Sequence, residues 1–273
     1  MPEGPEIRRV ADRLCHQLVD KPLQSTWFAF PELAGQGADL EGRRVLAVES
    51  WGKALLTYFD NGRVMYSHNQ LDGVWKLHRS SQEPSTRRSL RVRFQAGGHA
   101  ASLYSASDVS LWKSDQIGQH PFLSRLGPDL LSHGVSAGDI EERLAAPKFR
   151  RRALGGLLLD QGFYAGIGNY LRSEMLFFAG LAPQRRPVDL DVSQRARLAT
   201  VMRDVIHQAY RQAGVTNRPA WVEREKRAGA TREGWRFAVF GRDGLACHAC
   251  GNEVSRCMVT SRRLYYCPNC QSD

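Results

Sequence analysis

Apolar positions near the N-terminus recur at the spacing of one face of a helix. Within residues 4–19 they are Ile7, Val10, Ala11, Leu14, Cys15 and Leu18. Because an α-helix completes a turn about every 3.6 residues, this periodicity predicts an amphipathic helix that buries one side. Cys15 lies on the apolar face, and we interpret it as a small core residue.

Beyond this helix, as far as about His120, the pattern changes to short runs of strand character. The runs 54–59 and 64–68 flank an Asn61-Gly62 pair, which is a strong hairpin signal between apolar segments. Residues 90–94 alternate as LRVRF, and a Gly-Gly pair follows them. Several short strands separated by turns predict a β-sandwich or a barrel.

After Pro128 the pattern becomes helical. The candidate helices are 136–145, 150–161, 169–180 and 193–213. Ser193 can cap the start of the last one and Gly214 its end. Residues 215–235 are polar, basic and contain glycine, which predicts a mobile loop. We therefore expect an α+β protein in which a leading helix and a β-sandwich domain precede a helical domain and a cysteine-rich tail.

The expected domain boundaries are residues 1–125, 126–235 and 239–273. The chain has 273 residues, and 38 Lys and Arg against 28 Asp and Glu give a net charge of +10. This balance favours nucleic acid as the partner, although a generically basic soluble protein stays open. Because no apolar leader or membrane-length run is present, we expect a cytoplasmic protein with reduced thiols.

The cysteines of the tail have the spacing of a metal site. Cys247 and Cys250 form one C-x₂-C pair, and Cys267 and Cys270 form another after sixteen intervening residues. Two such pairs match a four-thiolate tetrahedral zinc site, with the segment between them forming a β-hairpin. We predict one structural Zn²⁺; an iron–sulfur cluster or a redox disulfide pair are the alternatives. His248 and Cys257 lie outside the spacing.

The N-terminus carries residues suited to nucleophilic chemistry. Removal of Met1 would free the secondary α-amine of Pro2, and an α-amine has an ordinary pKa of about 7.7–8.0. A useful fraction is then neutral and can attack a sugar carbon to give an iminium. Glu3 can protonate the sugar oxygen, and Glu6 lies one helical turn further on. By themselves these residues are also a common helix start.

The start MPEGPEIRRVAD resembles the formamidopyrimidine-DNA glycosylase and endonuclease VIII family. The resemblance extends over nearly the whole chain and is closest to bacterial endonuclease VIII. The segments that carry it are Trp51-Gly52-Lys53, YSHNQLDGVW (66–75), LYSASD (103–108), HPFLSRLGPD (120–129), residues 157–183 and the four-cysteine tail.

The resemblance implies roles for individual residues. Pro2 would form the Schiff base, Glu3 would donate a proton, and Lys53 would assist β-elimination. Arg262, five residues before the third cysteine, would hold phosphates and assist δ-elimination. Glu6 and Glu174 would support the site. For Arg263, the neighbour of Arg262, the choice between a phosphate contact and a solvated arginine stays open.

The resemblance also implies DNA contacts. Residues 157–183 match a helix–two-turn–helix, in which Asn169 would contact phosphate after the glycine-rich turn. The loop Gln70-Leu71-Asp72 would fill the gap that a flipped base leaves, with Leu71 as an apolar wedge. Asp72 stands where endonuclease VIII proteins tend to have an aromatic residue. Arg125 is a further DNA-binding candidate, and His68 is either a phosphate contact or a buried structural histidine.

The implied activity is that of a bifunctional DNA glycosylase and AP lyase of base excision repair. It would remove oxidised pyrimidines and cut the strand by β,δ-elimination. Two alternatives stay open: an enzyme of the same family for oxidised purines such as 8-oxoguanine, and a non-catalytic zinc-containing DNA-binding protein. We expect a monomer that acts on damaged double-stranded DNA at the bacterial nucleoid, without a membrane or a nucleotide cofactor.

Overall fold

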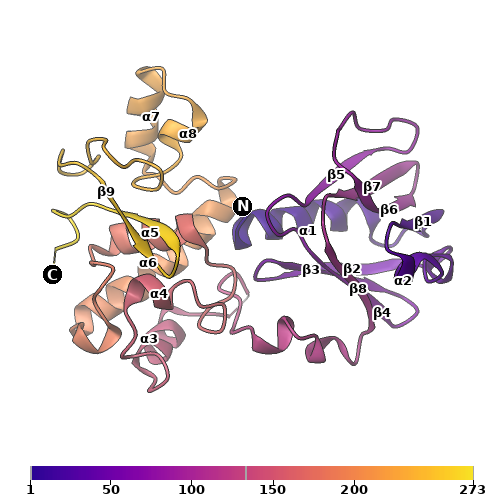
Figure 1. The fold of residues 1–273 in the computed structure, drawn as a ribbon, viewed down its shortest axis with the longest axis horizontal. Coiled ribbons are helices and arrows are strands. Elements are labelled where there is room, and N and C mark those ends of the chain that lie inside the picture. The colour runs from indigo at the N-terminus through magenta and orange to yellow at the C-terminus, as the bar shows by residue number, and fades with distance from the viewer. Residues whose placement is uncertain (1, 133, 273) are drawn as a thin grey trace. The chain divides into compact units, whose positions relative to one another are not determined.

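The structure is a computed structural model that describes residues 2–132 and 134–272 (Figure 1). The chain divides into two compact units, residues 1–125 and 126–273. Within the described residues, no helix is long and apolar enough to cross a membrane.

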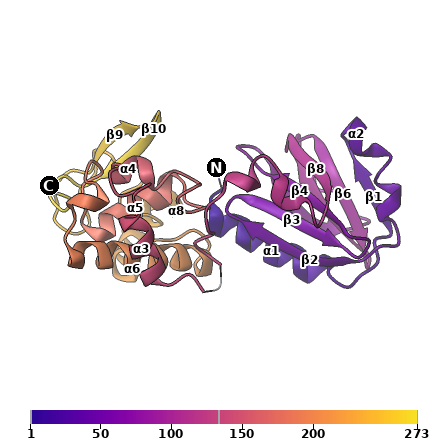
Figure 2. The same ribbon diagram turned by 90° about the horizontal axis from the view of Figure 1, so that it is seen from below.

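The first unit begins with the predicted amphipathic helix, α1 (Gly4–Leu18). Its buried face includes Ile7, Leu14 and Leu18, and α1 packs along β2 (Figure 2). At its start, the Glu6 carboxylate accepts a hydrogen bond of 3.0 Å from the Glu3 backbone N–H, which satisfies one donor that the first turn leaves unpaired. The expected leading helix is confirmed.

Two antiparallel four-stranded sheets follow, so the predicted β-sandwich is confirmed. One sheet has the order β2-β3-β4-β8 and the other the order β1-β6-β7-β5 (Figure 1). The strands are β1 (Ser25–Phe28), β2 (Val45–Trp51), β3 (Ala54–Phe59), β4 (Arg63–His68), β5 (Val74–Arg79), β6 (Leu90–Ala96), β7 (His99–Tyr104) and β8 (Asp108–Lys113). The short helices of this unit are α2 (Pro31–Ala34), η1 (Ala38–Leu40), η2 (Ile117–Gln119) and η3 (Leu123–Arg125).

Aromatic residues from both sheets meet in the core of the sandwich. Phe94 of β6 lies edge-on to Phe59 of β3, with ring centroids 5.7 Å apart. Trp75 of β5 stacks against the same Phe94 at 6.3 Å. The first contact joins the two sheets, and the second packs neighbouring aromatic residues within one sheet; both bury apolar area, which is the main stabilising term of a sandwich.

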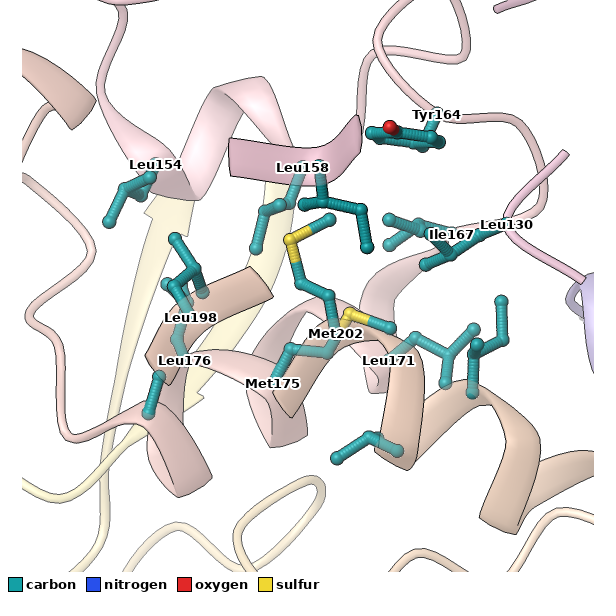
Figure 3. Close-up of a cluster of buried hydrophobic side chains, with 14 of the residues drawn as sticks. Leu130, Leu154, Leu158, Tyr164, Ile167, Leu171, Met175, Leu176, Leu198 and Met202 are labelled. Carbon is teal, nitrogen blue, oxygen red and sulfur yellow. The ribbon is translucent and has the colours of Figure 1, made fainter. Parts of the chain in front are cut away.

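The second unit is helical and ends in a β-hairpin. Its elements are α3 (Ala137–Ala145), α4 (Leu154–Leu157), α5 (Asn169–Ala179), η4 (Pro187–Asp189), α6 (Val192–Arg211), α7 (Pro219–Arg227), α8 (Arg232–Trp235), β9 (Ser255–Val259) and β10 (Arg262–Tyr266). Helices α5 and α6 pack through a core in which Leu171, Met175 and Met202 are buried (Figure 3). The hairpin packs against α5 (Figure 2).

Three sequence expectations for this unit are wrong in detail. The helix predicted over 150–161 is only α4, because an Asx turn at Asp160, whose carboxylate accepts from the Gly162 N–H at 2.8 Å, takes the chain out of helix. The segment 215–235, expected to be a loop, contains α7 and α8. The apolar anchors Trp221 and Val222 explain α7, since Val222 is buried and Trp221 stacks on Phe178.

The third correction concerns the ends of α6. Its N-cap is Asp191, which accepts a hydrogen bond from the Gln194 N–H at 2.8 Å, whereas Ser193 donates to the same carboxylate at 2.7 Å. A carboxylate at the cap is favoured by both geometry and the helix dipole. The C-cap is Gln212, two residues before Gly214.

The end of the first unit is fixed by a buried histidine. His120 stacks on Tyr66 with ring centroids 3.9 Å apart, and the Tyr66 hydroxyl donates to Asp108 at 3.1 Å. Burial lowers the pKa of His120, against the opposing effect of Asp108. The folded state therefore binds fewer protons at this site than the unfolded state between the folded pKa and about 6.5.

The lowered pKa of His120 predicts that the stability of the first unit falls in acid. Its contribution to stability is complete above pH 6.5 or so and is lost as the pH falls through the folded pKa of His120. We expect the thermal midpoint to decline between about pH 7 and pH 5, and the decline to be shallower in His120→Phe, which keeps the ring stack. The exposed His16→Gln variant is the control. An unchanged slope in His120→Phe would contradict this assignment.

Candidate nucleic-acid interface and metal site

The N-terminal candidates sit at the start of α1. Pro2 is half-buried, and Glu3 is the N-cap residue, with only 4% of its surface exposed. Their backbone groups lie at the positive end of the helix dipole, which favours a carboxylate and disfavours a protonated amine. Met1 lies outside the described residues.

Lys53 lies in the two-residue turn between β2 and β3. Trp51 pairs with Ala54 across this hairpin, and Gly52 takes a φ of +60°, which a glycine adopts without strain. On the next strand Ala54 pairs with His68, so the turn and His68 share one end of the sheet. Burial, with a smaller effect of Lys53, holds the pKa of His68 below its usual value.

His68 supports the loop that follows β4. Its Nδ1 accepts a hydrogen bond from the Gln70 N–H at 2.9 Å, and its ring packs edge-on against Phe122 at 5.3 Å. The unprotonated Nδ1 that this bond requires agrees with the lowered pKa. These contacts are compatible with a structural role for the half-buried His68, and its phosphate contact through the other nitrogen stays a prediction.

The loop Gln70-Leu71-Asp72 projects from the sandwich and is braced at both ends. Leu71 is 68% exposed, one of the most exposed large apolar side chains of the chain. The Ser107 hydroxyl donates to the Gln70 amide oxygen at 2.6 Å. The Gly73 N–H donates to the Asn69 carbonyl at 2.7 Å, and a Cβ at Gly73 would lie 2.5 Å from that oxygen. The sequence therefore needs glycine to close the loop.

Arg125 is the last residue of the first unit and of helix η3. It is exposed, and its Nε donates to the Pro121 carbonyl at 2.8 Å. This bond leaves the terminal amino groups of the guanidinium available to an anion, so its proposed DNA contact is compatible with the geometry.

The turn that precedes α5 is held by two side chains that the sequence did not single out. The Gln161 amide donates to the carbonyls of Leu159 and Ile167 at 2.9 and 2.8 Å and accepts from the Gly166 N–H at 3.1 Å. Arg143 of α3 donates to the Gly162 and Phe163 carbonyls at 2.8 and 2.6 Å. The side-chain hydrogen bonds of Gln161 and Arg143 thus hold the predicted glycine-rich turn in place. In the sequence, only the glycines indicate this turn.

Asn169 opens α5 and has one side of its amide occupied. Its oxygen accepts a hydrogen bond of 3.3 Å from Arg172, which is fully buried and also donates to the carbonyls of Gly155 and Arg263 at 2.8 and 3.0 Å. With its oxygen held this way, the Asn169 amide directs its NH₂ donors away from Arg172, as a phosphate contact at a helix N-terminus requires.

Ser173 and Glu174, which follow Arg172 in α5, bind main-chain groups near the C-terminus by hydrogen bonds. The Ser173 hydroxyl accepts from the Tyr265 N–H at 3.2 Å, and its own proton goes to the Asn169 carbonyl at 2.9 Å. The fully buried Glu174 carboxylate accepts from the backbone N–H groups of residues 238–240 at 2.8–2.9 Å and from the Thr216 hydroxyl at 2.6 Å. Burial raises the pKa of Glu174, and these four donors oppose that rise.

The β9–β10 hairpin presents the two arginines of the tail. Arg262 pairs with Val259 across a two-residue turn, and both Arg262 and Arg263 are exposed. The turn residues Thr260 and Ser261 have φ values of +50° and +60°, the backbone of a type I′ turn without its usual glycine. The hairpin predicted between the two cysteine pairs is confirmed.

The four cysteines of the tail fit a tetrahedral metal site. All four sulfur atoms lie within 4.8 Å of one another, with 3.9 Å between Cys247 and Cys270 and 3.5 Å between Cys250 and Cys267. A tetrahedron with Zn–S bonds of about 2.3 Å has sulfur–sulfur edges of about 3.8 Å. Burial and the neighbouring cysteines raise the pKa of the Cys270 thiol, and a bound cation would favour its thiolate form.

The remaining two residues near the tail have other contacts. His248 stacks on Trp221 at 5.3 Å and faces Arg224, whose guanidinium lies 2.7 Å from its Nδ1. Cys257 packs against the helical core through its strand. Neither belongs to the four-sulfur cluster, as the spacing indicated.

Replacing Glu174 should lower the stability of the protein and weaken the hydrogen bonding of residues 238–240. In Glu174→Ala, two buried backbone N–H groups and a partly buried one lose their acceptor, and we expect the unfolding free energy to fall by at least about 3 kcal/mol. Amide hydrogen exchange at residues 238–240 should accelerate most. The matched exposed variant Glu142→Ala should change stability by less than about 0.5 kcal/mol. Unchanged exchange at 238–240 would show that the carboxylate does not hold this segment.

Comparisons with known proteins identify the family. The formamidopyrimidine-DNA glycosylase N-terminal domain matches residues 1–107, and the formamidopyrimidine-DNA glycosylase H2TH domain matches residues 126–219. Endonuclease 8 of Pectobacterium carotovorum is 46% identical over 99% of this chain and 100% of that protein. Endonuclease 8 of Klebsiella pneumoniae is 45% identical over the same shares.

Solved structures show the same fold. The Lactococcus lactis enzyme Fpg in complex with DNA that contains N7-benzyl-Fapy-dG matches with a TM-score of 0.81 at 20% identity, over 100% of both chains. The same enzyme with abasic-site DNA matches at 0.80, over 99% of this chain and 100% of that one. The chain therefore belongs to the formamidopyrimidine-DNA glycosylase and endonuclease 8 family.

Proposed function

We propose that this protein excises oxidised pyrimidines from double-stranded DNA and then cuts the strand by β,δ-elimination, with the Pro2 amine as nucleophile. The family consists of DNA glycosylases with AP lyase activity, and full-length identity of 46% to an endonuclease 8 carries the proposal. Its active form begins at Pro2, because a retained Met1 would turn the nucleophilic nitrogen into an amide.

In the first half of the reaction, a bond from the Pro2 nitrogen to C1′ of the sugar replaces the bond from C1′ to the base. The Pro2 nitrogen attacks C1′, the bond from C1′ to the base breaks with its electron pair leaving on the base, and the base takes up a proton. Glu3 protonates the sugar ring oxygen so that the ring opens and leaves an iminium between Pro2 and C1′. The helix N-terminus beside Pro2 supports this step by disfavouring the protonated amine.

The second half cuts the strand. The iminium withdraws electrons from C2′, a proton leaves that carbon, and the 3′ phosphate departs with the electron pair of its C–O bond. Lys53 assists this β-elimination, and Arg262 assists the later δ-elimination of the 5′ phosphate, since cations stabilise the leaving phosphates. Lys53 belongs to the first unit and Arg262 to the second.

The other candidates bind the DNA. Asn169 and the start of α5 would contact a phosphate. Gln70, Leu71 and Arg125 would contact the strand near the lesion. The four cysteines would hold one Zn²⁺; because thiolates fill all four positions, that ion would stabilise the tail and supply no reaction step. We further propose that the protein acts as a monomer in the bacterial cytoplasm.

A borohydride trap tests the nucleophile. The protein is mixed with a duplex that contains thymine glycol, and borohydride reduces any iminium to a permanent bond. We expect a cross-link through Pro2, mapped by mass spectrometry, and an intact mass without Met1. Trapping on 8-oxoguanine alone would favour the oxidised-purine activity. Failure to trap even an abasic site would leave a DNA-binding protein without catalysis.

A substitution at Glu3 separates base removal from strand cleavage. An abasic sugar opens to its aldehyde without a catalyst, so Glu3→Gln should keep much of its lyase activity there. On thymine glycol the same variant should lose roughly 100-fold or more in single-turnover rate, the usual contribution of a positioned proton donor. The exposed Glu32→Gln is the control. Equal losses on both substrates would remove Glu3 from the proton-donor role.

A further inference from the structure

The loop Gln70-Leu71-Asp72 carries a carboxylate next to its apolar wedge. Leu71 is 68% exposed, and Asp72 is exposed beside it. A carboxylate repels the DNA phosphates, so at this position it needs a specific partner to be tolerated. The inference that follows rests on the proposed function, because it takes Leu71 to enter the duplex where the damaged nucleotide leaves.

The loop holds Asp72 in a defined place. Arg88, from the segment before β6, donates from its Nη1 to the Asp72 backbone carbonyl. The bond from the Gly73 N–H to the Asn69 carbonyl closes the loop behind it at 2.7 Å. The backbone of Asp72 is therefore anchored from two sides, and Arg88 adds a positive charge that offsets part of the repulsion from the DNA.

The carboxylate itself has no hydrogen-bond or ion-pair partner among the residues that the structure describes. Both of its oxygens can accept hydrogen bonds. When the damaged nucleotide is flipped out, the base that was paired with it keeps its hydrogen-bonding edge but has lost its partner. If Leu71 enters the duplex, the acceptor pair next to it would meet that edge.

The four bases differ in what this edge offers. Guanine presents two adjacent donors, the N1–H and the 2-amino group, which match the two oxygens of a carboxylate. Adenine and cytosine each present one amino donor beside a ring nitrogen that accepts, and thymine presents one donor between two carbonyls. An ionised carboxylate against any of these three meets an acceptor, and unpaired charge is costly.

We propose that Asp72 selects guanine opposite the lesion, so that the preferred substrates are oxidised cytosines, which arise opposite guanine. A bidentate pair of this kind discriminates by roughly tenfold or more. Asp72 is then a specificity residue that touches the undamaged strand and takes no part in the covalent steps.

The test places one lesion opposite each of the four bases. Dihydrouracil in a fixed sequence context is set against guanine, adenine, cytosine or thymine, and single-turnover excision is measured. We expect the rate opposite guanine to exceed the rate opposite adenine by about tenfold. Asp72→Asn should reverse this order, because a carboxamide presents one acceptor and one donor, which match adenine. Asp115→Asn, the same charge change at another exposed position of the first unit, should keep the wild-type order.

A binding experiment separates this inference from the proposed function. The affinity for duplexes with a tetrahydrofuran abasic analogue opposite each base needs no catalysis. Preference for guanine that is lost in Asp72→Asn supports the inference even if no iminium can be trapped. Rates and affinities that agree within twofold for all four bases overturn it, and a successful trap at Pro2 in that case leaves the glycosylase function in place.

Discussion

The structure of the second unit depends on three successive polar residues that are buried in one helix. Arg172, Ser173 and Glu174 of α5 point their side chains at main-chain groups of the tail, over sequence separations of 91, 92 and 64–66 residues. Burial of a charge is costly unless every lone pair and proton is matched. Glu174 meets that condition with four donors, which makes the geometry of residues 238–240 hard to change without unfolding the segment.

This arrangement gives one helix two tasks. The start of α5 carries Asn169 and the positive end of the helix dipole, where the phosphate contact is proposed. Arg172, which orients the Asn169 amide, also holds the carbonyl of Arg263 on the hairpin that carries Arg262. The proposed phosphate contact and the hairpin that carries the arginine proposed for δ-elimination are therefore linked through Arg172. The four-cysteine cluster lies at the other end of the same hairpin, so a metal ion bound there would stabilise the hairpin that carries Arg262.

Much of this could be predicted from the sequence where the signal is local. The amphipathic period of α1, the Asn61-Gly62 hairpin and the cysteine spacing each report on residues close in the chain, and the structure confirms all three. The bonds of Gln161 and Arg172 could not be predicted, since a polar side chain in a helical segment looks like any solvated residue until its distant partner is known. Helix α7 was missed for a related reason: its charged residues outnumber the apolar anchors that dock it.

The first unit meets a different constraint, because it holds the apolar side chain of Leu71, the proposed wedge, in water without losing its fold. Leu71 gains nothing from burial, so the loop is held by polar contacts instead: His68 and Ser107 bind Gln70, and Arg88 binds Asp72. Each contact uses a main-chain or amide group and leaves the Leu71 side chain and the Asp72 carboxylate facing outward. Rigidity of this kind lowers the entropy lost on binding. Because Arg88 binds the main-chain carbonyl of Asp72, a change of the Asp72 side chain should leave the shape of the loop intact, which is the property expected of the proposed specificity residue.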